Sequence, residues 1–222
     1  VVLLINTILT NLDLEIPEDE SQAALQAPVF LALGMNKALQ KLKILHSSSS
    51  SVPVHLAIRD GLEKNSTLEM LHRHTFNTEA FSISLLPTVL PFLRVSTTLK
   101  FLKIESGYEY DLNLRHRTTS CLAIATALRE NSSLENLEIY CEIGFSPDTY
   151  IAALQRLQPD ATLKELRIFP MIASSGKVEM NQVVSLVKKN YALTKLGKDF
   201  TELDNTGEIH AICRLNQAGR CY

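Results

Sequence analysis

His72 and His74 have the spacing that comes nearest to a chemical site in this sequence. They lie two residues apart in a segment predicted to be a strand, so their imidazoles point to the same side. Two imidazoles on one side are able to bind one metal ion, but no third ligand is evident near them. Paired exposed histidines without a metal are the more common arrangement. We therefore predict no metal site and no other cofactor.

The other residues capable of catalysis form no recognisable arrangement. Neither a G-x-S-x-G nor an H-E-x-x-H segment occurs, and the Gly176-Lys177 pair lacks the rest of a phosphate-binding loop. The remaining histidines stand apart from any nucleophile or carboxylate pattern, and they are His46, His55, His116 and His210. The sequence therefore predicts that the protein is not an enzyme.

Charge and cysteine content indicate the class of partner and the compartment. The net charge is -2 and lysine or arginine clusters are lacking, which argues against binding to nucleic acid or to acidic membranes. The four cysteines have no metal-binding spacing and are too few for a disulfide framework. We interpret them as reduced thiols, which predicts a cytoplasmic protein. We also predict that the protein is a monomer.

The apolar stretch over residues 1–14 has neither the basic start nor the cleavage site of a signal peptide, and its leucines match a spacing that recurs downstream. We predict no membrane segment here. The sequence begins in the middle of a repeated unit and without Met, so we expect it to be part of a longer chain.

The unit that recurs is L-x-x-L-x-[LI]. Its first leucines are 30, 29, 31, 35, 29 and 30 residues apart, a period typical of a solenoid, and they are Leu9, Leu39, Leu68, Leu99, Leu134, Leu163 and Leu193. An apolar residue stands six positions before each first leucine, and another stands ten positions before it in the six copies where the sequence reaches that far, which is the spacing of a helix face. Three positions before it stands an Asn, Ser or Asp, where we expect the helix to end. Each unit is thus predicted to be a helix, a tight turn and a short strand.

These residues resemble the leucine-rich repeat family, in its long, ribonuclease-inhibitor-like form. The resemblance implies a right-handed α/β solenoid, a horseshoe with parallel strands on its concave face and helices on its convex face. We expect an array of about seven units over residues 1–200 and a C-terminal helical cap over residues 201–222. The Asn or Cys that the family has eight positions after the first leucine is missing, so irregular turns are expected.

Several local features predict departures from a regular array. Arg73 and Lys198 stand where an aliphatic residue is expected, which predicts weakened strands in the third and seventh units. A helix is expected over residues 21–38, bent at Pro28, and another over residues 81–95 that Pro91 kinks or splits. A terminal helix is expected over residues 207–217. An insertion over residues 106–117, with Tyr108 and Tyr110, is either a functional loop or a tolerated surface insertion.

Function is predicted to lie on the solvent side of the strands. This broad surface of mixed charge and aromatic side chains suits a protein partner better than a small molecule. We therefore predict a non-catalytic scaffold or adaptor for protein–protein interaction, and the alternative is a GTPase-activating or other regulatory protein on the same fold. The candidate partner-binding residues are Phe101, Lys103, Tyr108, Tyr110, Tyr140, Arg167 and Phe169.

Overall fold

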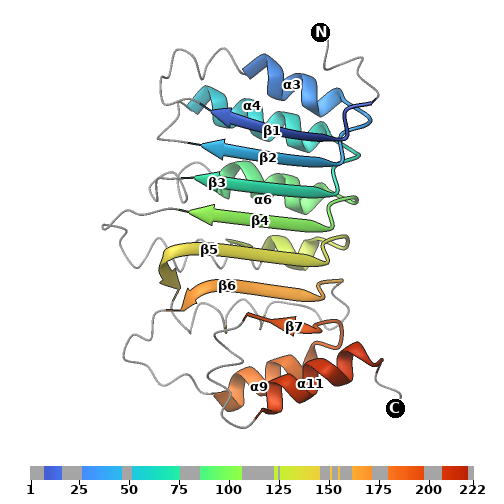
Figure 1. The fold of residues 1–222 in the computed structure, drawn as a ribbon, viewed down its shortest axis with the longest axis vertical. Coiled ribbons are helices and arrows are strands. Elements are labelled where there is room, and N and C mark those ends of the chain that lie inside the picture. Colours follow the sequence, from blue (N-terminus) through green and yellow to red (C-terminus); the bar gives the residue numbers. More distant parts are fainter. Residues whose placement is uncertain are drawn as a thin grey trace.

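The structure is a computed structural model that describes residues 8–16, 27–46, 52–75, 86–106, 123–124, 126–145, 151, 155, 162–171, 180–197 and 207–219. Within these residues the fold is α/β, with a single sheet of seven parallel strands that follow one another in chain order (Figure 1). The strands are β1 (Asn11–Ile16), β2 (Lys41–His46), β3 (Met70–Thr75), β4 (Phe101–Ser106), β5 (Asn136–Phe145), β6 (Glu165–Met171) and β7 (Lys195–Leu196).

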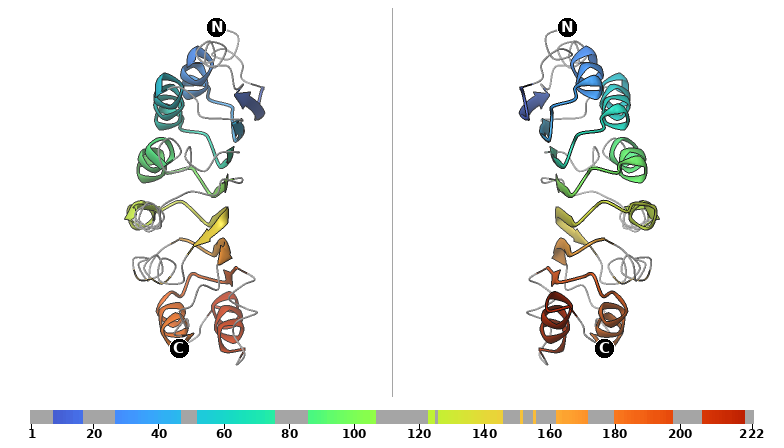
Figure 2. Two further views of the ribbon diagram at one scale, coloured as in Figure 1. Left: turned by 90° about the vertical axis from the view of Figure 1, so that its left-hand side faces the viewer. Right: turned by 90° about the vertical axis from the view of Figure 1, so that its right-hand side faces the viewer.

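Within the described part of the chain, helices cover one face of this sheet and leave the other face uncovered over most of its length (Figure 2). They are α3 (Ala27–Met35), α4 (Val52–Lys64), α6 (Leu86–Val95) and α9 (Met180–Lys189). The last helix, α11 (Glu208–Gln217), lies beside α9 at the C-terminal end of the sheet and buries Ile209, Ile212 and Cys213. In the described part of the chain, no helix combines the length and the apolar character needed to cross a lipid bilayer.

The leucine spacing produces the core because it places the same position of each unit side by side. The second leucines of the units form one row across the sheet, and all of them are buried except Leu12 in the edge strand β1. The first leucines from Leu39 to Leu193 are buried as well. Residues of the strands alternate between this core and the uncovered face, as expected from the twofold period of a strand.

The structure bears on four expectations about individual elements and corrects the one about the third strand. The helix expected over residues 21–38 is described over Ala27–Met35 as α3, which includes Pro28. The expected start of that helix lies outside the described residues. Pro91 does not split α6, which continues through it to Val95. The strand of the third unit is not weakened, since β3 pairs with both neighbours over all six residues despite Arg73. In the seventh unit, β7 has only two residues, as the pattern predicted.

The asparagines that end the helices also connect neighbouring units. Asn65 follows α4, and its side-chain oxygen accepts hydrogen bonds from the backbone N–H groups of Thr67 and Leu68, at 3.0 and 2.8 Å. Its side-chain nitrogen donates to the carbonyl oxygens of Leu33 and Asn36 in the preceding unit, at 2.8 and 3.3 Å. A single buried amide therefore closes its own turn and binds the turn before it.

Hydroxyl groups beside these asparagines make a second row of contacts between units. Each belongs to the residue before a first leucine and donates to the carbonyl oxygen of the first leucine one unit earlier, at 2.8 to 3.0 Å; the residues are Thr67, Thr98, Ser133 and Thr162. Side chains just before the first leucines therefore connect consecutive units in a regular row.

Helices α3 and α4 approach closely at Gly34 and Gly61. A Cβ atom at Gly61 would lie 2.1 Å from the carbonyl oxygen of Phe30, and one at Gly34 would lie 2.6 Å from the carbonyl oxygen of Gly61. Both distances are far inside van der Waals contact. The two backbones therefore require glycine at their crossing.

We expect Gly61→Ala to lower the free energy of unfolding by about 1–3 kcal/mol, because the two helices must move apart. Alanine is the better helix former by about 1 kcal/mol, so a rise would mean that the close contact is not present. Chemical denaturation measures the change. Lys64→Ala, an exposed substitution on the same helix, serves as the control and should change stability by no more than about 0.5 kcal/mol.

Candidate functional site

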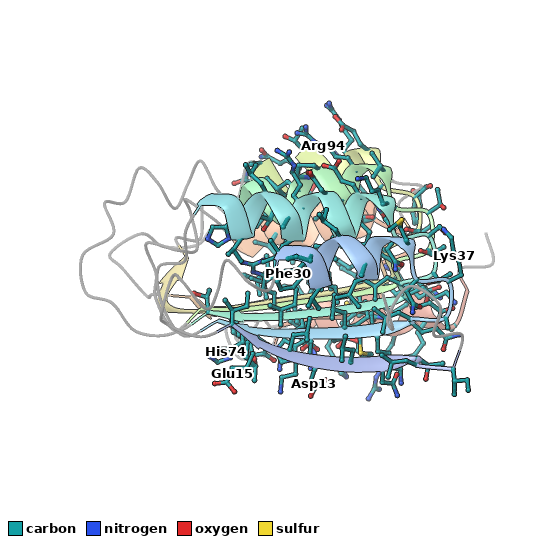
Figure 3. The ribbon with its side chains drawn as sticks, turned by 90° about the horizontal axis from the view of Figure 1, so that it is seen from above. Asp13, Glu15, Phe30, Lys37, His74 and Arg94 are labelled. Atoms are coloured by element: carbon teal, nitrogen blue, oxygen red, sulfur yellow. The ribbon has the colours of Figure 1, made fainter. Side chains whose placement is uncertain are left out.

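The uncovered side of the sheet carries the predicted interaction residues. We call it the strand face, and its described side chains belong to Asn11, Asp13, Glu15, Lys41, Lys43, Leu45, Met70, His72, His74, Phe101, Lys103, Glu105, Asn136, Glu138, Tyr140, Glu165 and Arg167. All of them are exposed or half-buried, while the residues between them pack toward the helices. Figure 3 shows Asp13, Glu15 and His74 on the side of the sheet opposite Phe30, which lies between helix and sheet.

An aromatic and basic cluster on β4, β5 and β6 contains four of the predicted residues. Strand pairing places Lys103 beside Glu138, and Glu138 beside Arg167. The Lys103 ammonium lies 5.1 Å from the centre of the Tyr140 ring, within the range of a cation–π interaction. Phe101 is half-buried at the start of β4, opposite Asn136. The structure therefore brings Phe101, Lys103, Tyr140 and Arg167 onto neighbouring strands of one face.

The remaining candidates are not tested in the same way. Phe169 pairs with Tyr140 through the backbone of β6, but its side chain is outside the described part of the structure. Tyr108 and Tyr110 also lie outside the described residues, as does the 106–117 insertion beyond Ser106.

Both cations of the cluster are engaged by carboxylates. Arg167 Nη1 lies 3.2 Å from Glu138 Oε1, and its other terminal nitrogen contacts Glu165. Burial tends to lower the pKa of Arg167, but the two carboxylates and a hydrogen bond with Tyr140 outweigh it and raise that pKa. Lys103 Nζ lies 2.7 Å from Glu105 Oε1. The cluster thus offers a partner an aromatic surface within a network of paired charges rather than a positive patch.

A second cluster lies on β3 and β4, where Glu105 stands between the two histidines. Its Oε2 atom lies 2.6 Å from His72 Nε2 and 3.2 Å from His74 Nδ1. One ring nitrogen of His72, one of His74 and one carboxylate oxygen of Glu105 all lie within 4.8 Å of one another, which is close enough for them to bind a single metal ion. This arrangement corrects the sequence-based view that a third ligand is lacking.

Electrostatics within the second cluster favours a charged carboxylate beside neutral histidine. Burial raises the pKa of Glu105, but hydrogen bonds from Lys103, His72 and His74 outweigh it and bring that pKa to about 2. Burial lowers the pKa of His72, and the hydrogen bond with Glu105 offsets this only in part. At neutral pH, His72 is therefore an uncharged imidazole, which is the form that binds metals.

Sequence reasoning missed Glu105 as a partner of the histidines because it is 31 residues from His74. The signal was nevertheless present, since His74 and Glu105 occupy the same position in successive units and pair across β3 and β4. A search one repeat period away, rather than only nearby in the chain, would have found it.

Comparisons with known proteins identify a solved structure with a similar fold but no matching family. No protein-family model matches the chain, and neither does any curated protein. Among solved structures, the chain is similar to Leiomodin-1 Actin-Binding Site 2, with a TM-score of 0.58 and 17% sequence identity, over 77% of this chain and 92% of that one. At this level of identity, the likeness concerns the fold alone.

Proposed function

We propose that this protein is a non-catalytic protein-interaction scaffold of the leucine-rich repeat type, binding a protein partner on its strand face. In this proposal the array is a right-handed solenoid whose strand face is concave, the protein is a cytoplasmic monomer, and α11 belongs to a C-terminal cap. The observation that carries the proposal is the strand face itself, an uncovered surface on neighbouring strands with aromatic side chains set among paired charges. Aromatic and arginine side chains contribute most of the binding energy at many protein interfaces.

Actin is the first partner to test. The similar solved structure is an actin-binding site of Leiomodin-1, so a chain segment with a related fold serves for actin binding in that protein. Fold alone does not carry a partner from one protein to another, so binding must be measured directly. The test uses purified monomeric and filamentous actin, followed by affinity capture from cell extract and identification of any other protein retained.

For a partner bound on the strand face, we expect Phe101→Ala combined with Tyr140→Ala to weaken affinity by about 30-fold or more, the effect of losing an interface hot spot. The matched control is Leu56→Ala combined with Val95→Ala, which removes two exposed apolar side chains from helices on the other side. The control should bind like the parent. Thermal unfolding of both double variants shows whether each is folded. Equal affinity in the folded Phe101/Tyr140 variant and the parent would reject the strand face as the site.

A GTPase-activating function is the second candidate, because Arg167 is an arginine on the strand face and such proteins often supply an arginine to the transition state. Its two carboxylate partners would first have to release it. An assay of GTP hydrolysis over a panel of small GTPases separates the candidates. A rate increase that is lost in Arg167→Ala would favour this function over a passive scaffold.

A further inference from the structure

We propose that His72, His74 and Glu105 form a binding site for a divalent transition-metal ion, and specifically for Zn²⁺. The ligands would be His72 Nε2, His74 Nδ1 and Glu105 Oε2, three atoms that already converge on one point of the strand face. The site is independent of the proposed scaffold function, because it rests only on the geometry of β3 and β4.

The strand geometry brings the ligands together without any special loop. His72 and His74 are two apart in β3, so they share a face, and the pairing of His74 with Glu105 places the carboxylate directly beside them. Zinc bonds to histidine nitrogen and carboxylate oxygen are about 2.0–2.2 Å long, so tetrahedral ligand atoms lie about 3.3 Å apart. The observed distances of 2.6 and 3.2 Å to Glu105 Oε2 are close to this spacing, and the ligand atoms of the three residues all lie within 4.8 Å of one another.

The surroundings hold the carboxylate in position. Lys103 binds Oε1 of Glu105 at 2.7 Å, and this leaves Oε2 directed at the histidines. Hydrogen bonds of this kind from a neighbouring residue orient metal ligands and fix their geometry. The positive charges of Lys103 and of nearby Lys43 oppose a cation, so we expect weaker binding than in zinc sites with several thiolates.

The ligand set selects the class of metal. Two imidazoles and one carboxylate suit zinc and its neighbours in the first transition row, whereas Ca²⁺ and Mg²⁺ prefer sites made of oxygen ligands. The three side chains are about one-fifth to one-quarter exposed, so they reach solvent. With three protein ligands, a bound zinc ion would keep a fourth position open for water or for a donor atom of another molecule.

The test is calorimetric titration of Zn²⁺ into the metal-free chain in a buffer that does not bind zinc. The parent is compared with His72→Ala, His74→Ala and Glu105→Gln, and with His210→Ala as a control that removes an exposed histidine from α11. Each ligand variant is expected to bind at this site at least about tenfold more weakly, and His210→Ala is expected to match the parent. Absence of Zn²⁺ binding by the parent, or equal affinity in all the variants, would overturn the proposal.

Two further measurements keep the result specific to this site. Thermal unfolding without metal shows that the ligand variants are folded, and added Zn²⁺ should raise the melting temperature of the parent and the control more than that of the ligand variants. In crystals soaked with zinc, anomalous diffraction should give a peak within bonding distance of His72, His74 and Glu105. A peak only at other residues would refute the assignment. Substituting Mg²⁺ for Zn²⁺ should leave the site empty, and Mg²⁺ binding of similar strength would contradict the choice of metal.

Discussion

Replacing Asn131 with alanine is expected to lower the free energy of unfolding by about 3 kcal/mol, although the side-chain hydrogen bonds described for Asn131 are made to the turns rather than to the strand face. Its side-chain oxygen accepts from the backbone N–H groups of Ser133 and Leu134, at 2.9 and 2.7 Å. Its side-chain nitrogen donates to the carbonyl oxygens of Leu93 and Ser96, at 2.6 and 3.0 Å. Alanine would leave two donors and two acceptors in the buried turns without this partner.

The size of the effect follows from burial. Asn131 is 7% exposed, so water does not readily replace the lost amide. A buried polar group left without a partner costs about 1–3 kcal/mol, and partial relaxation of the turns keeps the total below the sum over all such groups. The same bonds recur at Asn65, so Asn65→Ala is expected to have a similar effect.

Denaturant unfolding followed by circular dichroism measures this loss. Asn136→Ala is the matched control, since it removes the same amide five residues later from the half-buried strand face and should cost no more than about 0.5 kcal/mol. If both variants lost the same stability, the link between units through Asn131 would contribute nothing beyond an ordinary surface asparagine.

The positions of helices and strands could be predicted from the sequence because a repeated period tests each assignment several times. The helices that end before Asn36, Asn65, Ser96 and Asn190 stop where the pattern predicted, and strand residues alternate as predicted from β1 to β6. The leucine at the second position of each strand sets which face is buried, and a shift of one residue would expose the whole row.

Contacts between units were much harder to predict. The asparagines were interpreted as helix stops, whereas their side chains also bind the preceding unit, and local conformational preference says nothing of a partner about 30 residues away. The contact of the two histidines with Glu105 was not predicted for the same reason, because Glu105 is more than 30 residues away in the sequence. In both cases, the prediction needed to know which residues of successive units lie side by side. The register of the repeat gives that information.

At Arg73 the prediction from sequence was wrong. An aliphatic residue was expected there, which predicted a weak strand, but β3 pairs with both neighbouring strands over all six residues. Arg73 lies between Ile44 of β2 and Ile104 of β4, both buried, and pairing with these strands on either side holds β3 in place. Strand pairing therefore keeps a charged arginine at a position whose neighbours in the sheet are buried and apolar.

Arg73→Ile is expected to raise the free energy of unfolding by about 1–4 kcal/mol, as when buried charges are replaced by apolar residues. The Arg73 side chain is fully buried, and in the described part of the structure no carboxylate pairs with it. Its guanidinium reaches only Thr88 Oγ1 and His55 Nδ1, both at 3.4 Å, and Nε has no partner among the described residues. Thr88 and His55 have further interactions, so they are not left without partners by the change.

The lowered pKa of Arg73 expresses the same cost of burial. Burial lowers this pKa to about 10, which corresponds to about 3 kcal/mol against the charged form in the folded chain. At neutral pH the guanidinium is protonated in both the folded and the unfolded chain, so all of this free energy opposes folding. It would be relieved only as the pH rises above about 10, where the folded arginine begins to lose its proton.

Arg73→Lys separates the effect of charge from that of shape. Lysine keeps the positive charge and a long stem but has fewer donors, so it should not stabilise the protein, whereas isoleucine removes the charge and extends the row formed by Ile44 and Ile104. Denaturant unfolding of the parent and both variants at neutral pH measures the three free energies. If isoleucine destabilised the protein as much as lysine does, the guanidinium would be compensated in the folded chain, and the cost inferred from its burial would be wrong.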